Sequence, residues 1–265
     1  MQNPADLTDD VDVIKVSGRF TLTDCKADDA QGKITHDKDS SGNKYEGKGV
    51  KVLGGTFDMY GGIITGNTSN YDIGGSGVSI EGVSDTTKAS VFNMYGGTIT
   101  GNTATSGGGV HVRRIVWYGP SEFHMYGGSI TNNSAKSDAA SYGVGGGVYV
   151  SWTSKFVMSG GTISENTATQ NGGGLYASAL AKEYVSSSGG AAALNVSGDA
   201  IIRDNTVDSK KNNVYLDSST TDIDAVSATL TINNPLTGEI GVTAAAAVPV
   251  IIATGAESDT DYSAV

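Results

Sequence analysis

The chain is poor in the residues that build several common kinds of site. It has one cysteine, Cys25, in 265 residues, which excludes an intrachain disulfide framework and a cysteine-cluster metal site. Its three histidines, His36, His111 and His124, are scattered, and we expect the last two to face outward on separate sides of the fold. No cofactor is therefore expected. Calcium bound by loop acids such as Asp37 stays open as an alternative, although the full spacing of a calcium loop is missing.

Positive charge and long apolar runs are also scarce. The 17 Lys and Arg against 28 Asp and Glu give a net charge of -11, which argues against nucleic acid as a partner because no basic stripe is available for phosphates. No apolar run is long enough to cross a membrane, so no membrane insertion is expected within this segment. The start "MQNPADLTDD" lacks the basic and apolar parts of a signal peptide. We therefore expect an excised part of a larger multidomain chain.

Glycine, in contrast, is abundant. There are 38 Gly and only 4 Pro, whereas glycine makes up about 7% of an average chain. Apolar residues are 38% and aromatic residues 7% of the sequence, which is enough for a core at this charge. A folded chain in which a tight turn recurs at fixed places is therefore expected.

A unit of three short phrases repeats along the sequence. The first phrase is "FNMYGG" at residues 92–97, the second is "ITGN" at 99–102, and the third is "GVHV" at 109–112. The spacing between copies varies while the phrases keep their length, so the variation lies in the loops, as in a solenoid. We interpret "IKVSGR" at 14–19 and "LTINNP" at 230–235 as weakened end copies of the first phrase.

Alternation within the phrases predicts which side chains share a face. Phe92 and Met94 must lie on one side of their strand, and Asn93 and Tyr95 on the other. No such strand can bury its apolar side alone, but coils stacked about 4.8 Å apart bury all of them. The sequence therefore predicts an all-β fold, a right-handed parallel β-helix of about seven coils with three short strands per coil. Its second corner should carry a ladder of side-chain amides, formed by Asn67, Asn102, Asn133, Asn166 and Asn205.

The predicted organisation has three parts. Residues 1–46 form an N-terminal cap and first rung with a polar loop, 47–232 form the β-helix repeats, and 233–265 form a closing rung and the start of a following segment.

The segment "ITGNTATSGGGVHV", residues 99–112, resembles the repeats of polymorphic membrane proteins and the β-helix repeats of large bacterial adhesin-like surface proteins. The resemblance covers about residues 11–241, with Ile99 in place of the Phe of the FxxN motif. It implies a β-helix at the bacterial cell surface, outside the cell. It further implies a non-catalytic adhesin or stalk role, with a host or bacterial surface glycan or protein as the partner.

Candidate ligand-binding residues lie in the loops that follow the third phrase. These loops leave the same corner of successive coils, so they should cluster in space, and their aromatic and Arg residues suit binding. The candidates are Arg113, Arg114, Trp117, Tyr118, Trp152, Lys182 and Tyr184. Two outward tyrosine columns add Tyr149, Tyr176 and Tyr215, and Tyr60, Tyr95 and Tyr126. Alternatively, the two tryptophans anchor the loops and the tyrosines serve only cross-coil packing.

The alternative function is a polysaccharide lyase or glycoside hydrolase, because β-helices also carry such enzymes. An enzyme of this kind would need two or three carboxylates that converge on one face. The outward column of the first strand is expected to offer a single carboxylate, Asp58, below Lys15. Glu165 and Asp204 occupy a turn position typical of solvated charges. We therefore expect no catalytic residue and no metal site, and a purely structural spacer is the second alternative.

Overall fold

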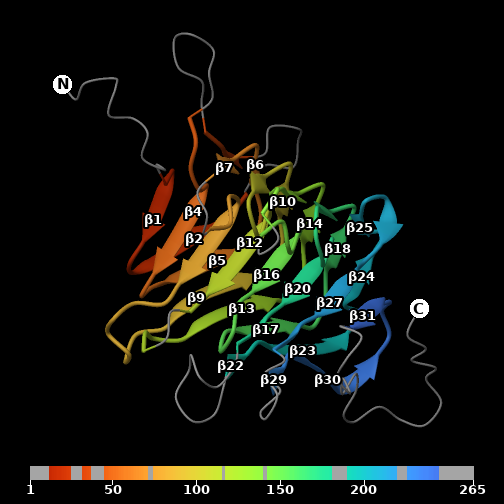
Figure 1. Ribbon diagram of the computed structural model, residues 1–265. Coiled ribbons are helices and arrows are strands. Elements are labelled where there is room, and N and C mark those ends of the chain that lie inside the picture. Colours follow the sequence, from red (N-terminus) through yellow and green to blue (C-terminus); the bar gives the residue numbers. More distant parts are fainter. Residues whose placement is uncertain are drawn as a thin grey trace.

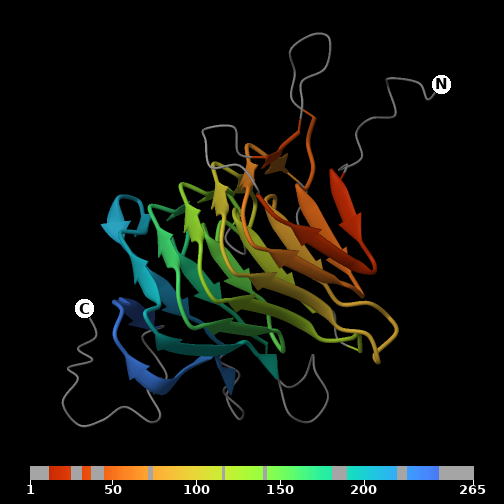
Figure 2. The same ribbon diagram turned by 180° about the vertical axis from the view of Figure 1, so that it is seen from behind.

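The computed structural model describes residues 12–24, 32–36, 45–70, 74–114, 117–139, 142–180, 190–219 and 226–244. The regular secondary structure of these residues is entirely β-strand, and the strands wind into a right-handed parallel β-solenoid (Figures 1 and 2). The predicted fold class is therefore confirmed. Cys25, Asp37, Lys182 and Tyr184 lie outside the described residues.

Four parallel sheets form the wall of the solenoid, and we number them in the order in which the chain passes through one coil. Sheet 1 consists of β2 (Arg19–Leu22), β5 (Thr56–Met59), β9 (Ser90–Met94), β13 (Ser121–Met125), β17 (Lys155–Met158), β23 (Ala193–Gly198) and β30 (Thr229–Leu236). Sheet 2 consists of β3 (Lys33–Ile34), β6 (Ile63–Thr65), β10 (Thr98–Thr100), β14 (Ser129–Thr131), β18 (Thr162–Ser164) and β24 (Ile201–Arg203).

The other two sheets complete the wall. Sheet 3 consists of β7 (Thr68–Ser69), β11 (Thr103–Ala104), β15 (Ser134–Ala135), β19 (Thr167–Ala168), β25 (Thr206–Val207) and the antiparallel β26 (Lys210–Lys211). Sheet 4 consists of β1 (Ile14–Val16), β4 (Val50–Leu53), β8 (Val78–Glu81), β12 (Val110–Arg113), β16 (Val148–Val150), β20 (Leu175–Ala177), β27 (Val214–Leu216) and β31 (Val242–Ala244). Two hairpins lie outside the wall, β21 (Ala179–Leu180) with β22 (Gly190–Ala191), and β28 (Ser218–Ser219) with β29 (Val226–Ser227).

About 5 complete coils contribute one strand to every sheet, and an incomplete coil lies at each end. This agrees roughly with the predicted number of coils. Each complete coil has four strands rather than the predicted three, because a strand of two residues follows the asparagine turn. Strands such as Thr103–Ala104 are too short to show the alternation by which strands are recognised in a sequence.

The interior is filled by columns of like side chains. Phe92 pairs in register with Phe123, and their rings stack with centroids 4.8 Å apart. Full burial of such a side chain contributes about 1.5–3 kcal/mol. Two columns confirm the predicted interior and consist of fully buried residues: Phe57, Phe92, Phe123 and Phe156, and Met59, Met94, Met125 and Met158.

The glycine triplet before sheet 4 is required by close approach of the backbone, within one coil at Gly107 and between successive coils at Gly108 and Gly109. Gly107 has φ +65, and a Cβ there would lie 2.9 Å from the Cβ of His111. A Cβ on Gly108 would lie 2.5 Å from the carbonyl oxygen of Ser134. A Cβ on Gly109 would lie 2.6 Å from the carbonyl oxygen of Gly147. At each of these positions a side chain would clash with a neighbouring atom, so only glycine fits.

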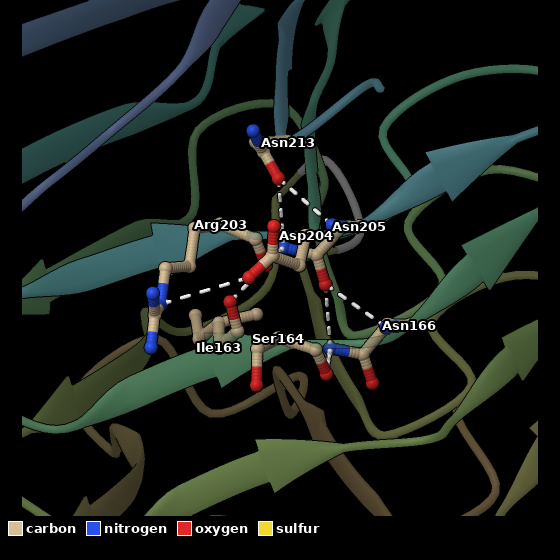
Figure 3. A network of polar contacts seen from close by, with 7 residues as sticks. All are labelled: Ile163, Ser164, Asn166, Arg203, Asp204, Asn205 and Asn213. Carbon is tan, nitrogen blue, oxygen red and sulfur yellow. Dashed lines mark hydrogen bonds and ion pairs between the residues drawn. The ribbon is translucent and has the colours of Figure 1, made fainter. Parts of the chain in front are cut away.

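The predicted asparagine ladder is present, and Figure 3 shows its C-terminal part. The backbone N and Nδ2 of Asn102 both donate to Oδ1 of Asn133, at 3.1 and 2.9 Å, and the same Nδ2 donates to the carbonyl oxygen of Ile64 at 3.0 Å. This pattern continues to Asn205, and all five side chains are buried. The ladder therefore satisfies backbone groups as well as itself.

Two residues outside the repeat end the ladder. The backbone N and Nδ1 of His36 donate to Oδ1 of Asn67, at 3.1 and 2.9 Å. At the other end Asn205 donates through its backbone N and Nδ2 to Oδ1 of Asn213, at 2.9 and 3.1 Å (Figure 3). Asn213 occupies the place that Gly174 holds one coil earlier. A donor therefore caps one end and an acceptor caps the other.

One end copy was assigned to the wrong phrase. Ile14 pairs with Val50, so residues 14–16 form a strand of sheet 4 and not of sheet 1. The first strand of sheet 1 is β2, where Phe20 stacks on Phe57 with centroids 5.4 Å apart. Thr21, and not Lys15, therefore lies beside Asp58. The other end copy was assigned correctly, since Leu230 pairs with Leu194.

Candidate functional site

The loops between sheet 4 and sheet 1 lie together along the lower edge of Figure 1. Hydrogen bonds join successive loops: Gly119 N donates to Val83 O at 2.7 Å, and Thr153 N donates to Ala191 O at 3.1 Å. Arg114 N donates to Ser151 Oγ at 3.2 Å. The predicted clustering of these loops is confirmed for their described parts. We call this surface the loop edge; it comprises residues 82–89, 114, 117–120, 151–154, 178–180, 190–192, 217–219 and 226–228.

Trp117 is the most exposed aromatic side chain of the loop edge. It is 71% exposed, and its φ of 73° lies in the left-handed region, where a bulky residue is strained. Nε of Arg114 donates to the carbonyl oxygen of Tyr118 at 3.0 Å and so closes the base of the loop. The half-buried Tyr118 packs closely over Gly82. The loop is therefore held at its base and presents the indole to solvent.

Trp152 and Arg113 differ from Trp117 in exposure. Trp152 is half-buried, and its Nε1 is buried without a hydrogen-bond partner among the described residues. Arg113 is also half-buried, and its carbonyl oxygen accepts a hydrogen bond from Ser121 Oγ at 2.7 Å. The geometry therefore favours an anchoring role for Trp152, whereas the indole of Trp117 is left open to solvent.

The tyrosine column on sheet 4 is largely covered. Tyr149, Tyr176 and Tyr215 are half-buried, and the rings of the last two stack with centroids 5.5 Å apart and planes at 3°. Burial raises the pKa of Tyr176, and the nearby Asp217 carboxylate raises it further. These phenols therefore stay protonated, and little of their ring faces is available to a ligand.

His111 lies on the outer side of sheet 4, as expected, but it is not exposed. It is 2% exposed, and its ring stacks on Tyr149 with centroids 4.6 Å apart. Neither ring nitrogen has a hydrogen-bond partner among the described residues. Burial, together with the positive charges of Arg113 and Lys48, lowers the pKa of His111 to about 3. The predicted outward direction is therefore correct, and its burial is explained by the turns at Gly75 and Gly107, where an added Cβ would lie 2.8 and 2.9 Å from the Cβ of His111.

The tyrosine column on sheet 1 is exposed. The ring centroids of Tyr60 and Tyr95 are 4.6 Å apart, and those of Tyr95 and Tyr126 are 4.9 Å apart. The three residues are 52%, 41% and 46% exposed in that order. The rings stack, which is the packing role expected of them, and they also present aromatic surface to solvent.

Asp58, the single carboxylate expected beside this column, is fully engaged. Nε and Nη2 of Arg19 each lie 2.8 Å from its Oδ2, and Asn93 Nδ2 donates to its Oδ1 at 2.8 Å. The side chain is 1% exposed. This charge-assisted contact, in which both Arg19 nitrogens share one oxygen, holds the first complete coil to the incomplete coil before it. Because Asn93 occupies the other oxygen, neither oxygen is free for acid–base chemistry.

The acids of the turn between sheets 2 and 3 lie in solvent. Glu165 and Asp204 have φ of 57° and 55°. Glu165 accepts a hydrogen bond from Asn132 at 3.1 Å, and Asp204 lies 3.7 Å from Nε of Arg203 (Figure 3). Within the described ranges, no three His, Cys, Asp or Glu side chains lie together as metal ligands would.

Asp199 was not among the sequence candidates, although it follows the strand that lies two coils beyond Tyr126. The turn from Val196 to Ile201 is one residue longer than the equivalent turn from Met158 to Thr162. This extra residue is visible in the sequence as "SGDAII" at 197–202 against "SGGTI" at 159–163, but its effect depends on where the added side chain points.

Comparisons with known proteins give no relative. No family model matches the chain, no curated protein matches it, and no solved structure matches it. Among the residues with a described structure there is no helix with the length and apolarity needed to span a membrane.

Proposed function

We propose that this chain is a non-catalytic module of a bacterial cell-surface protein, an adhesin or stalk that binds a surface glycan or protein through its loop edge. The observation that carries the proposal is Trp117, an indole 71% exposed on a loop whose base is closed by Arg114. Exposed aromatic side chains on a rigid scaffold are typical anchors of binding surfaces. Backbone strain that the surrounding loop maintains also points to a functional position.

The scaffold supports the same role. Hydrogen bonds between coils, stacked interior columns and the asparagine ladder give a rod on which the loops recur at one edge. A rod of this kind holds several loops in fixed relative positions, which suits recognition of an extended ligand. The sequence resemblance to adhesin-like repeats supports the cell-surface location and the extracellular setting.

The test is binding of the purified protein to a glycan array and to cultured host and bacterial cells, compared with Trp117→Ala. Loss of an anchoring tryptophan costs about 2 kcal/mol or more, so we expect binding to fall about 30-fold. Arg203→Ala, at the opposite corner of the solenoid, should bind as the wild type does. Binding that is unchanged by Trp117→Ala would exclude the loop edge. Failure of the wild type to bind any glycan or cell would support the purely structural spacer instead.

A further inference from the structure

The exposed tyrosine column ends at Tyr126. One face of this ring is covered by Tyr95, with centroids 4.9 Å apart and planes at 11°. The next two coils place Ser159 and then Ser197 in the same column, because Met125 pairs with Met158 and Met158 with Val196. A serine side chain is too short to cover a tyrosine ring. The second face of Tyr126 therefore opens onto a step in the surface of sheet 1.

His124 widens this step. Its ring centroid lies 6.2 Å from that of Tyr126, and the two planes differ by 11°. His124 lies two residues before Tyr126, a spacing that puts both side chains on the same face of the sheet, so their rings lie side by side with nearly parallel planes. Nε2 of His124 lies 3.0 Å from Oε2 of Glu122, which orients the imidazole. Below it in the next coil stands the short side chain of Val157.

Asp199 adds a carboxylate beside the step. It is the extra residue of the longer turn, and it is exposed. A Cβ placed on Gly160 would lie 2.9 Å from Oδ1 of Asp199, so the carboxylate lies against the residue that follows Ser159. An inserted residue often re-aims a side chain in this way. The step thus combines an aromatic face with a hydroxyl and a carboxylate.

We propose that this step binds a pyranose ring of a carbohydrate, with Tyr126 and His124 as its platform and Asp199 as its hydrogen-bond acceptor. The apolar C–H face of a pyranose carries weak positive charge and complements the negative face of an aromatic ring. Its rim of hydroxyls can donate to Asp199 in charge-assisted hydrogen bonds. Apolar and aromatic side chains with a few placed polar groups are the usual lining of a small-ligand site.

This site goes beyond the function proposed for the loop edge and does not depend on it. The loop edge joins sheet 4 to sheet 1, whereas the step lies where sheet 1 passes toward sheet 2. A stable protein partner would cover about 800 Å² on each side, which is far more than one ring face and its flanking groups offer. A single sugar ring fits this small surface better.

The decisive variant is Ser159→Tyr, which extends the tyrosine column by one ring and covers the open face of Tyr126. Tyrosine occupies this place in three earlier coils, so the fold should accept it. The probes are neutral pyranose oligosaccharides on an array, followed by saturation-transfer NMR titration of those that bind. We expect the wild type to bind and Ser159→Tyr to bind at least about 10-fold more weakly, which corresponds to about 1.4 kcal/mol.

Two further variants sharpen the test. Asp199→Asn replaces a charged acceptor by a neutral one that can still accept a hydrogen bond, so it should weaken binding about 3- to 10-fold. Thr23→Tyr extends the column at its other end, next to Tyr60, and should leave binding unchanged. Thermal unfolding of each variant verifies that it folds.

Three outcomes would overturn the proposal. The first is a wild type that binds no pyranose at millimolar concentration, and the second is a Ser159→Tyr variant that binds as well as the wild type. The third is binding that survives Ser159→Tyr but is lost in Trp117→Ala, since the sugar would then belong to the loop edge. Loss of cell binding in Trp117→Ala, with pyranose binding retained, would support both sites independently.

Discussion

Two corners of this solenoid, the asparagine corner and the loop edge, differ in how strictly their sequence repeats from coil to coil. At the asparagine corner, between sheets 2 and 3, the same residue type recurs from Asn67 to Asn205 and every side chain is buried. At the loop edge, successive coils carry loops of different length and composition, and Trp117 is 71% exposed. The same residue must recur where the side chains of one coil form the hydrogen bonds of the neighbouring backbone. The sequence can vary where solvent forms those hydrogen bonds instead. The difference separates the part that maintains the rod from the part that can acquire a ligand.

Asn133→Ala is expected to have the largest effect on this comparison. It removes the acceptor of two donors on Asn102 and leaves the carbonyl oxygen of Ile99 without its side-chain donor. Each buried polar group left unsatisfied costs about 1–3 kcal/mol, so the free energy of unfolding should fall by about 4 kcal/mol. Urea denaturation followed by circular dichroism measures the change.

The neighbouring Asn132→Gly is the matched control. Asn132 is exposed with φ 55°, and Gly101 holds the same turn position one coil earlier. Its replacement should change stability by about 0.5 kcal/mol or less. Similar losses in the two variants would contradict the distinction between a buried ladder and a solvated turn.

Gly109→Ala should be the next most damaging change. Its Cβ would meet the carbonyl oxygen of Gly147 at 2.6 Å and Nδ2 of Asn133 at 3.0 Å. Forcing the coils apart costs about 1–3 kcal/mol. Gly18→Ala, where no atom lies within 4 Å of the added Cβ, should leave the thermal midpoint unchanged or raise it slightly.

The buried His111 predicts a dependence of stability on pH. Its pKa is lowered from 6.5 to about 3 in the folded protein. Above pH 6.5 the histidine is neutral in both states and imposes no penalty. Below that pH the unfolded chain binds a proton that the folded protein cannot, so stability falls by about 1.4 kcal/mol per pH unit and by about 2–3 kcal/mol at pH 4.5.

The variant that tests this dependence is His111→Phe, which keeps a ring against Tyr149 and has no titratable group. The difference in unfolding free energy between wild type and variant should grow as the pH is lowered from 7 to 4.5. A difference that stays constant over this range would show that His111 is not the group responsible.

Trp117→Gly should have the smallest effect, and in the opposite direction. Glycine adopts φ 73° without strain, and the exposed indole covers little of the core. We expect stability to stay equal or to rise by up to about 1 kcal/mol. A substantial loss of stability would mean that the tryptophan supports the loop edge rather than serving a ligand.

Sequence reasoning recovered the parts of the fold that depend on one strand and its copies. The columns headed by Phe57 and Met59 and the asparagine ladder follow from alternation and repetition alone. The fourth strand was missed because two residues show no alternation. Lys15 was misplaced because "IKV" has the apolar–polar–apolar pattern of both sheet 1 and sheet 4 strands, and only the pairing of Ile14 with Val50 decides between them.

The candidate site was less predictable because exposure depends on more than one coil. Alternation places His111 on the outer side of its strand, but it does not show that a turn covers it. The shared exit corner of their loops groups Trp117 with Trp152, but it does not show that their exposure differs. The step at Tyr126 depends on what the following coil places beside the ring, and the contribution of Asp199 depends on the path of a turn one residue longer.

The direction of the asparagine ladder sets how this protein can change length. Each ladder residue gives its donors to the next coil and receives donors from the previous one. A whole coil can therefore be inserted into or deleted from the middle of the solenoid without breaking the ladder. His36 would still cap one end as a donor, and Asn213 would still cap the other as an acceptor. Evolution or design can lengthen the rod by duplicating an interior coil, whereas an added coil at either end needs a new cap of matching polarity.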